Sequence, residues 1–269
     1  MAVPLPRRRI VMWQSLALAA ILATSGAGLS TALWLVSHDD PPLWRVVAHV
    51  AVLAIGVLVW ARFWWAVWTV WRRTEERRRR QRELADLLGE SDGTIPALRV
   101  LRHDAPVAYC IPDRTQTRVV LSSATIEKLD ADELRAVLEH ERSHLSARHD
   151  LILEGFEFLR AAYPKLLRTD APLEQSRVMV ELLADDAARK AAGDRPLARA
   201  IVAMAGSAAP AGTLGAGGVA TIRMRRLTDP PTRWWATALA LTISAVVLVV
   251  PTVFLAIPWM AHAARVLIG

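Results

Sequence analysis

The sequence predicts a mostly helical α+β domain with a small sheet, combined with about three transmembrane α-helices. Two observations support this fold class. Long apolar runs lie on both sides of a charged middle region, and within that region short β-branched runs precede stretches with helical periodicity. With 269 residues, of which 53% are hydrophobic, the chain can form one modest water-exposed domain and several membrane spans.

The apolar runs define the outer parts of the chain. Residues 10–36 contain no charged side chain, and residues 45–71 form a second run with Arg62 near its tryptophan-rich end. A third run, residues 234–259, is interrupted by Pro251. Runs of this length can cross a bilayer. We therefore expect residues 1–71 to form a membrane region with two spans (about 10–36 and 45–71), and residues 233–269 to form a third span with a short tail.

Arginines orient these spans. They gather at residues 7–9, 72–82 and 223–233, on one side of the three spans, whereas Asp39 and Asp40 lie in a turn on the other side. The positive-inside rule therefore places residues 72–232 in the cytoplasm, as one domain of a multi-pass protein of the cell membrane. The arginine run beside the second span favours contact with anionic membrane lipids, so direct binding of nucleic acid is not expected.

Short strands are predicted at the start of the middle domain, at residues 98–101, 105–111 and 118–121. Cys110, the only cysteine, lies in the second of them and excludes an internal disulfide. A buried, inert thiol is the expected state of Cys110. A ligand or nucleophile role is the alternative, and neighbouring residues in the sequence do not support it.

A capped helix follows these strands. Asp130 and Glu133 fit a D-x-x-E capping box. Apolar residues then recur with helical spacing, namely Leu134, Val137, Leu138 and Leu145. This pattern predicts a helix with one buried face.

His140, Glu141 and His144 form an H-E-x-x-H motif on this helix. Positions i and i+4 share a helix face, so the two imidazoles can bind one zinc ion. Glu141 lies towards the open side of such a metal, where it can take a proton from water and return one to a leaving amine. The alternative is a chance match, in which the histidines bind no metal.

A third ligand is predicted on a second helical stretch, residues 178–192. Glu181 and Asp185 lie four residues apart on it, and small Ala184 and Ala188 allow close approach to the first helix. Catalytic zinc takes three protein ligands and keeps one open position, so Glu181 is the expected third ligand. Asp185 is the expected acceptor for a ligand histidine's other N–H. The alternative is that both belong to a solvated acidic face.

H-E-x-x-H, the following Arg148-His149-Asp150 and the E-x-x-x-D about forty positions on resemble the membrane-embedded gluzincin metallopeptidases. Within these, the chain looks like the BlaR/MecR-type antirepressor peptidases, which are related to HtpX-like and CAAX prenyl proteases. The likeness covers residues 105–192. It implies a zincin-like fold, one zinc per chain bound by His140, His144 and Glu181, and Glu141 as catalytic base.

The resemblance also implies a biological role. The catalytic domain would be cytoplasmic and would act in signal transduction by cleaving a protein such as a BlaI-like winged-helix repressor. No penicillin-binding sensor follows the last predicted span, so direct β-lactam sensing is not expected. Two alternatives remain open, a quality-control protease of HtpX type and a non-enzymatic membrane adaptor with a structural zinc.

Three further predictions concern the surroundings of the site. His149 and Arg177 are candidates for stabilising the transition state, and a purely structural role is the alternative for His149. A strand made of Arg118, Val119, Val120 and Leu121 is predicted at the edge of the sheet, where an extended substrate could add as another strand. An interior position is the alternative for this strand. Residues 207–220, rich in glycine and alanine, are predicted to be a linker or a lid over the cleft.

Overall fold

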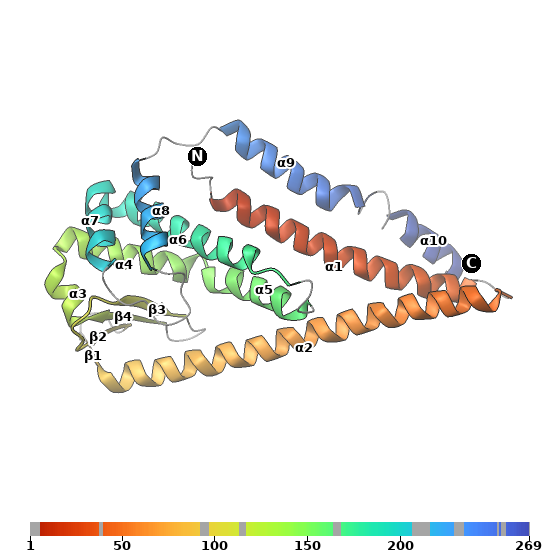
Figure 1. The fold of residues 1–269 in the computed structure, drawn as a ribbon, viewed down its shortest axis with the longest axis horizontal. Helices are drawn as coiled ribbons and strands as arrows, with labels where there is room; N and C mark the ends of the chain where they lie inside the picture. The colour runs from red at the N-terminus through yellow and green to blue at the C-terminus, as the bar shows by residue number, and fades with distance from the viewer. Residues whose placement is uncertain are drawn as a thin grey trace. The chain divides into compact units, whose positions relative to one another are not determined.

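The computed structural model describes residues 6–37, 40–91, 97–112, 117–163, 168–205, 216–228, 234–251, 253 and 257–268. The strands are β1 (Gly89–Ser91), β2 (Leu98–Leu101), β3 (Ala108–Ile111) and β4 (Arg118–Ser122). The helices, shown with the strands in Figure 1, are α1 (Pro6–Ser37), α2 (Leu43–Leu88), α3 (Ser123–Lys128), α4 (Ala131–Ser146), α5 (His149–Ala162), α6 (Ala171–Ala192), α7 (Asp194–Met204), α8 (Ala216–Thr228), α9 (Trp234–Pro251) and α10 (Ile257–Ile268).

The described residues form two compact units. One consists mainly of residues 69–157 and 169–232, and the other of residues 8–68, 158–168 and 233–269. The first unit contains the sheet, α4, α6, α7 and α8, so it holds the H-E-x-x-H motif together with Glu181 and Asp185.

The small sheet of the first unit has helices packed on both faces. Its strand order is β1-β2-β4-β3, with β2 and β4 parallel and the other neighbours antiparallel. On one face, Leu98 and Leu121 pack with Val137 of α4 and Ala200 of α7. On the other face, Val120 packs with Ala85 near the end of α2. The sheet therefore supports the start of the H-E-x-x-H helix directly.

Strand β4 is interior, so the prediction that Arg118, Val119, Val120 and Leu121 form an edge strand is wrong. β4 pairs with β2 on one side and with β3 on the other. Val120 and Leu121 point to opposite faces of the sheet, and each is only 1% exposed. Consecutive apolar residues are typical of a strand covered on both faces, which is the physical reason for the interior position. Among the described strands, the edges are β1 and β3.

Helix α2 continues past the apolar run through the arginine-rich segment and ends at Leu88. Gly89 then starts β1, and a Cβ at this position would lie 2.9 Å from Cβ of Arg99, which is too close. Within the arginine run, Arg78 is part of the fold rather than a lipid-facing residue. Its guanidinium lies 3.0 Å from Asp150 and also pairs with Glu154, and all three side chains are largely buried.

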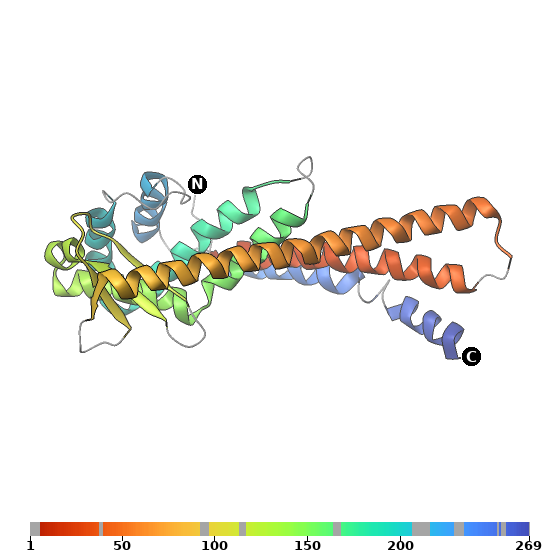
Figure 2. The same ribbon diagram turned by 90° about the horizontal axis from the view of Figure 1, so that it is seen from below.

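The second unit contains two helices that meet closely. Gly28 of α1 and Gly56 of α2 bring the two backbones together, since a Cβ on Gly56 would lie 3.7 Å from Cα of Gly28. Near the turn between the helices, the Trp34 ring stacks on His49 with centroids 3.7 Å apart. Figure 2 shows α1 running beside the first part of α2. Small residues at such a contact are typical of membrane helix pairs.

Two helices among the described residues are long and apolar enough to cross a membrane, not the predicted three. They contain the spans Ile10–Leu35 and Leu43–Leu88. Within the predicted third span, residues 234–259, α9 ends at Pro251 and α10 starts at Ile257, while residues 252 and 254–256 lie outside the described part of the chain. Helix α9 has eighteen residues, which cover about 27 Å, close to the roughly 30 Å of a hydrocarbon core.

Candidate metal centre

Local sequence determines where the H-E-x-x-H helix begins. The Asp130 carboxylate accepts from the backbone N–H groups of Asp132 at 3.0 Å and Glu133 at 2.8 Å. The Glu133 carboxylate in turn accepts from the backbone N–H of Asp130 at 3.2 Å, which completes the predicted capping box. Val137 and His140 lie on the buried face of α4, so the first histidine of the motif points inward.

Helix α6 brings the third predicted ligand to α4. Ala184 and Ala188 are fully buried, and Ala188 packs with Ala136 of α4. These small side chains allow the two helices to pack closely, as predicted. Gly193, with φ of +91°, ends α6 in a conformation that favours glycine.

His140, His144 and Glu181 converge at one point between the two helices. Nε2 of His140 lies 3.2 Å from Nε2 of His144 and 3.3 Å from Oε2 of Glu181. Nε2 of His144 lies 3.5 Å from Oε1 of Glu181. One ligand atom from each residue lies within 4.8 Å of the other two. Two imidazole nitrogens and one carboxylate oxygen form the donor set that catalytic zinc uses, with one position left open.

Asp185 lies behind His140. Its Oδ1 is 3.0 Å from Nδ1 of His140, on the ring edge opposite Nε2, and Asp185 is only 3% exposed. Burial would lower the pKa of His140, but the hydrogen bonds to Asp185 and Glu181 outweigh it and raise this pKa to about 9. Burial would likewise raise the pKa of Glu181, yet the hydrogen bond from His140 holds it well below its usual range.

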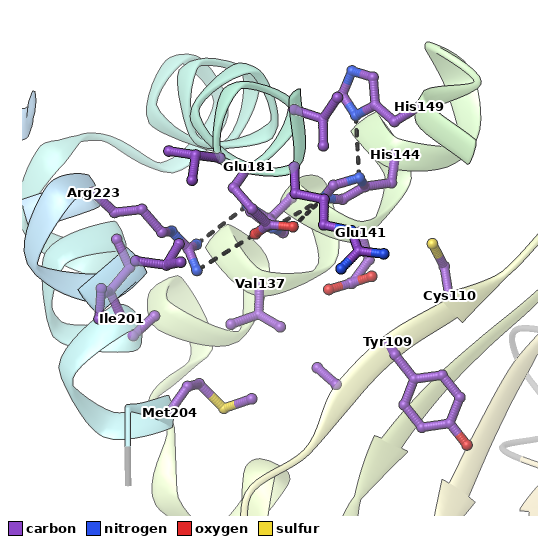
Figure 3. A pocket seen from close by; sticks show the side chains of 18 of the residues that line it. Tyr109, Cys110, Val137, Glu141, His144, His149, Glu181, Ile201, Met204 and Arg223 are labelled. Carbon is purple, nitrogen blue, oxygen red and sulfur yellow. Dashed lines mark hydrogen bonds and ion pairs between the residues drawn. The ribbon is translucent and has the colours of Figure 1, made fainter. Parts of the chain in front are cut away.

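Arg223 of α8 is part of this site and was not identified from the sequence. Its Nε and Nη2 lie 2.8 and 2.6 Å from the two carboxylate oxygens of Asp185. Its Nη1 lies 3.7 Å from Glu181 (Figure 3). Residues 216–220, predicted as part of a linker or lid, belong to the same helix, while residues 207–215 lie outside the described part of the chain. A buried, charged aspartate needs a cation nearby in addition to its hydrogen bond from a histidine. The sequence around Asp185 does not indicate which arginine supplies that cation.

Glu141 faces a cavity of about 660 Å³ that the two zinc-binding helices, β3, α7 and α8 line. Burial raises the pKa of its carboxyl group, so proton uptake by Glu141 is easier than for an exposed glutamate. Cys110 of β3 faces Glu141 across this cavity (Figure 3). Burial, together with the neighbouring carboxylate, raises the pKa of the thiol, so it stays protonated at physiological pH. Its position beside Glu141 was not expected.

The two candidates for transition-state stabilisation also line the cavity. His149 is 3% exposed and lies behind His144, with 3.1 Å between their Nδ1 atoms. Burial lowers the pKa of His149 to about 4, so its ring is neutral at physiological pH. Arg177 of α6 pairs with Glu157 of α5 at 3.2 Å.

Part of the chain resembles a known peptidase family. Residues 72–179 match the model of peptidase family M48, which is less than half of the chain. The protein is a zinc metallopeptidase, and this part of it is similar to peptidase family M48. The match includes the H-E-x-x-H helix and ends two residues before Glu181, so the third ligand of this peptidase rests on the geometry of α6. Searches of curated proteins and of solved structures gave no match.

Proposed function

We propose that this zinc metallopeptidase, which is similar to family M48, is a membrane-bound endopeptidase that cleaves a cytoplasmic protein. The observation that carries the proposal is the position of Glu141, whose side chain opens into the same cavity as the three zinc ligands. When bound, zinc polarises the scissile carbonyl and acidifies a water molecule. Glu141 accepts the proton of that water and delivers it to the leaving amine. Asp185 holds the ring of His140 in the ligating orientation.

Edge strand β3 is the proposed binding surface for the substrate backbone, in place of β4. The backbone N–H of Ser122 donates to the carbonyl of Val107 at 2.9 Å, which makes Val107 and Ser122 a hydrogen-bonded pair. In an antiparallel ladder such pairs alternate with non-bonded ones. Ala108 and Cys110 therefore direct their N–H and C=O groups away from β4. An extended peptide could pair with them beside Glu141.

The cavity has an apolar end that would accept a hydrophobic side chain of such a peptide. Its walls there come from α7 and α8 and include Leu197, Ile201, Met204, Val219 and Ala220. The opposite end carries His149, Asp150 and Arg177. A peptide held by backbone hydrogen bonds and one apolar side chain is recognised with little sequence specificity. This mode of binding fits cleavage in an exposed, flexible segment of the substrate.

Arginine distribution supports a cytoplasmic location for this cavity. Arg72, Arg73, Arg77, Arg79 and Arg80 are exposed on α2, directly after its apolar span. Exposed arginines at the end of a span favour the cytoplasmic leaflet and its anionic lipids. In this orientation the peptidase would meet cytoplasmic substrates, among them a regulator such as a BlaI-like repressor.

Purified full-length protein in detergent tests the activity. We expect zinc-dependent cuts within peptides of a mixed library, lost on treatment with a chelator and restored by zinc. No cleavage by the zinc-loaded protein would contradict the proposal.

A second experiment distinguishes two substrate classes. It identifies the protein N-termini that are present in cells producing the parent enzyme and missing in cells producing the Glu141→Gln variant. One or a few cuts in a cytoplasmic regulator support the regulatory role. Many cuts in membrane proteins indicate an HtpX-like quality-control role instead.

A further inference from the structure

The two zinc histidines have different partners behind them. Nδ1 of His140 lies 3.0 Å from a carboxylate oxygen of Asp185. Nδ1 of His144 lies 3.1 Å from Nδ1 of His149. The first arrangement belongs to the E-x-x-x-D pattern of α6, whereas the second comes from the turn between α4 and α5. His144 therefore depends on a partner outside the ligand helices.

Proton placement between the two rings follows from the metal site. Nε2 of His144 faces His140 and Glu181, so its lone pair is the one available to zinc. A neutral His144 that ligates through Nε2 carries its proton on Nδ1. Two Nδ1 atoms 3.1 Å apart can share one hydrogen, but not two or none. Nδ1 of His149 is therefore the acceptor, and His149 carries its own proton on Nε2.

The backbone holds His149 in this position. Helix α4 ends at Ser146, and Arg148 adopts φ of +50°, a left-handed conformation uncommon for a residue with a side chain. This turn reverses the chain so that the first residue of α5 faces the last turn of α4. The His149 ring is buried and stands at 86° to the His144 ring, with centroids 4.9 Å apart. An edge-on contact of this kind fixes both the plane and the tautomer of His144.

We propose that His149 is a positioning residue that orients His144 for zinc through its Nδ1 atom. It does for His144 what Asp185 does for His140, with a neutral acceptor in place of a carboxylate. The inference rests on the same zinc site as the proposed peptidase activity. The inference is tested mainly by zinc affinity, whereas the role of Glu141 is tested by cleavage. Either result can therefore be negative while the other is positive.

Three substitutions at one position separate the possible roles of His149. The amide oxygen of Asn lies about as far from the backbone as Nδ1 of His, whereas the amide of Gln reaches the position of Nε2. We expect His149→Asn in the full-length protein to keep its zinc affinity within about threefold of the parent. His149→Gln and His149→Ala should weaken zinc binding about 10–100-fold, the range for loss of such a partner.

Chelator competition measures these affinities, and far-UV circular dichroism checks that each variant is folded. Cobalt in place of zinc adds a spectroscopic readout, since its visible absorption follows ligand geometry. The spectrum should be unchanged in His149→Asn and altered in His149→Gln and His149→Ala.

Two results would overturn the proposal. Unchanged zinc affinity in all three variants, with cleavage kept only in His149→Gln, would show that His149 acts on substrate through Nε2. Equal loss of zinc in all three variants, including a folded His149→Asn, would show that ring shape matters and the Nδ1 acceptor does not.

Discussion

The guanidinium of Arg223 lies against both carboxylate oxygens of Asp185, at 2.6 and 2.8 Å, and so joins α8 to the zinc-binding helices. Asp185 is almost fully buried, and its other close partner is the His140 ring. Burial would raise the pKa of Asp185, but His140 and Arg223 hold it low. Arg223 therefore keeps a buried carboxylate charged at the position where it supports a zinc ligand.

Removal of this guanidinium should destabilise the site. Arg223→Gln leaves the buried Asp185 charge without its cation, which costs on the order of 3 kcal/mol. The matched control is Arg226→Gln on the same helix, because Arg226 pairs with the more exposed Asp186 and touches no ligand. Its cost should be at most about 1 kcal/mol. Thermal unfolding and zinc affinity measure both variants, and equal effects would show that Arg223 has no special link to the metal centre.

Loss of the third ligand should abolish tight zinc binding. Glu181→Ala removes the only carboxylate in the ligand set, so we expect much less than one zinc per chain by metal analysis. Glu174→Ala, at an exposed position on the same helix, should keep full occupancy. Full occupancy in Glu181→Ala would exclude this residue as a ligand.

Zinc affinity should rise with pH between 6.5 and 9. Burial lowers the pKa of His140, but Asp185 and Glu181 raise it to about 9, so in the metal-free protein zinc must displace a proton from His140. His144 adds no opposing trend, because burial lowers its pKa to about 4. One displaced proton corresponds to about tenfold tighter binding per pH unit, measurable by chelator competition at pH 7 and 8. An affinity independent of pH in this range would contradict the proton assignment.

The same proton affects the stability of the metal-free protein. A histidine with a raised pKa contributes stability that is fully present below its unfolded value of 6.5 and is lost as the pH rises through about 9. The Tm of the metal-free protein should therefore fall over this range. Asp185→Asn removes the strongest of the interactions that raise this pKa, so the variant should show a smaller change.

Substrate binding along β3 predicts a specific effect of proline. Ala108→Pro removes an N–H directed away from β4, so kcat/KM for peptide cleavage should fall about 3–10-fold through a higher KM. Zinc content should stay at one per chain. Ala108→Gly keeps the N–H and serves as the control. Unchanged KM in a folded Ala108→Pro variant would rule out pairing of substrate with this amide.

Local sequence patterns were sufficient to predict the three zinc ligands, but not the residues that surround them. The capping box at Asp130, the i and i+4 histidines, and the Glu181–Asp185 pair lie on single helices, so their spacing determined which residues share a face. Arg223 lies 38 residues after Asp185, and its contact depends on how α8 packs, which no local pattern specifies. Cys110 meets Glu141 for the same reason, through packing of β3 on α4.

The order of the strands in the sheet could also not be predicted from the sequence. The edge position of residues 118–121 was inferred from their place in the chain before the metal-binding helix. The insertion of β4 between β2 and β3 is decided by long-range pairing. The three adjacent apolar residues from Val119 to Leu121 were a usable signal for burial on both faces.

The assignment of Glu141 as general base is tested most directly by Glu141→Gln, with metal content and cleavage measured on the same preparation. An amide cannot accept the proton of water, so we expect one zinc per chain and cleavage reduced about 10²–10⁴-fold. Glu139→Gln is the control, because Glu139 lies on the same helix and pairs with Arg142 at 2.6 Å. Its cleavage rate should match that of the parent. Cleavage near the parental rate in zinc-loaded Glu141→Gln would contradict the account.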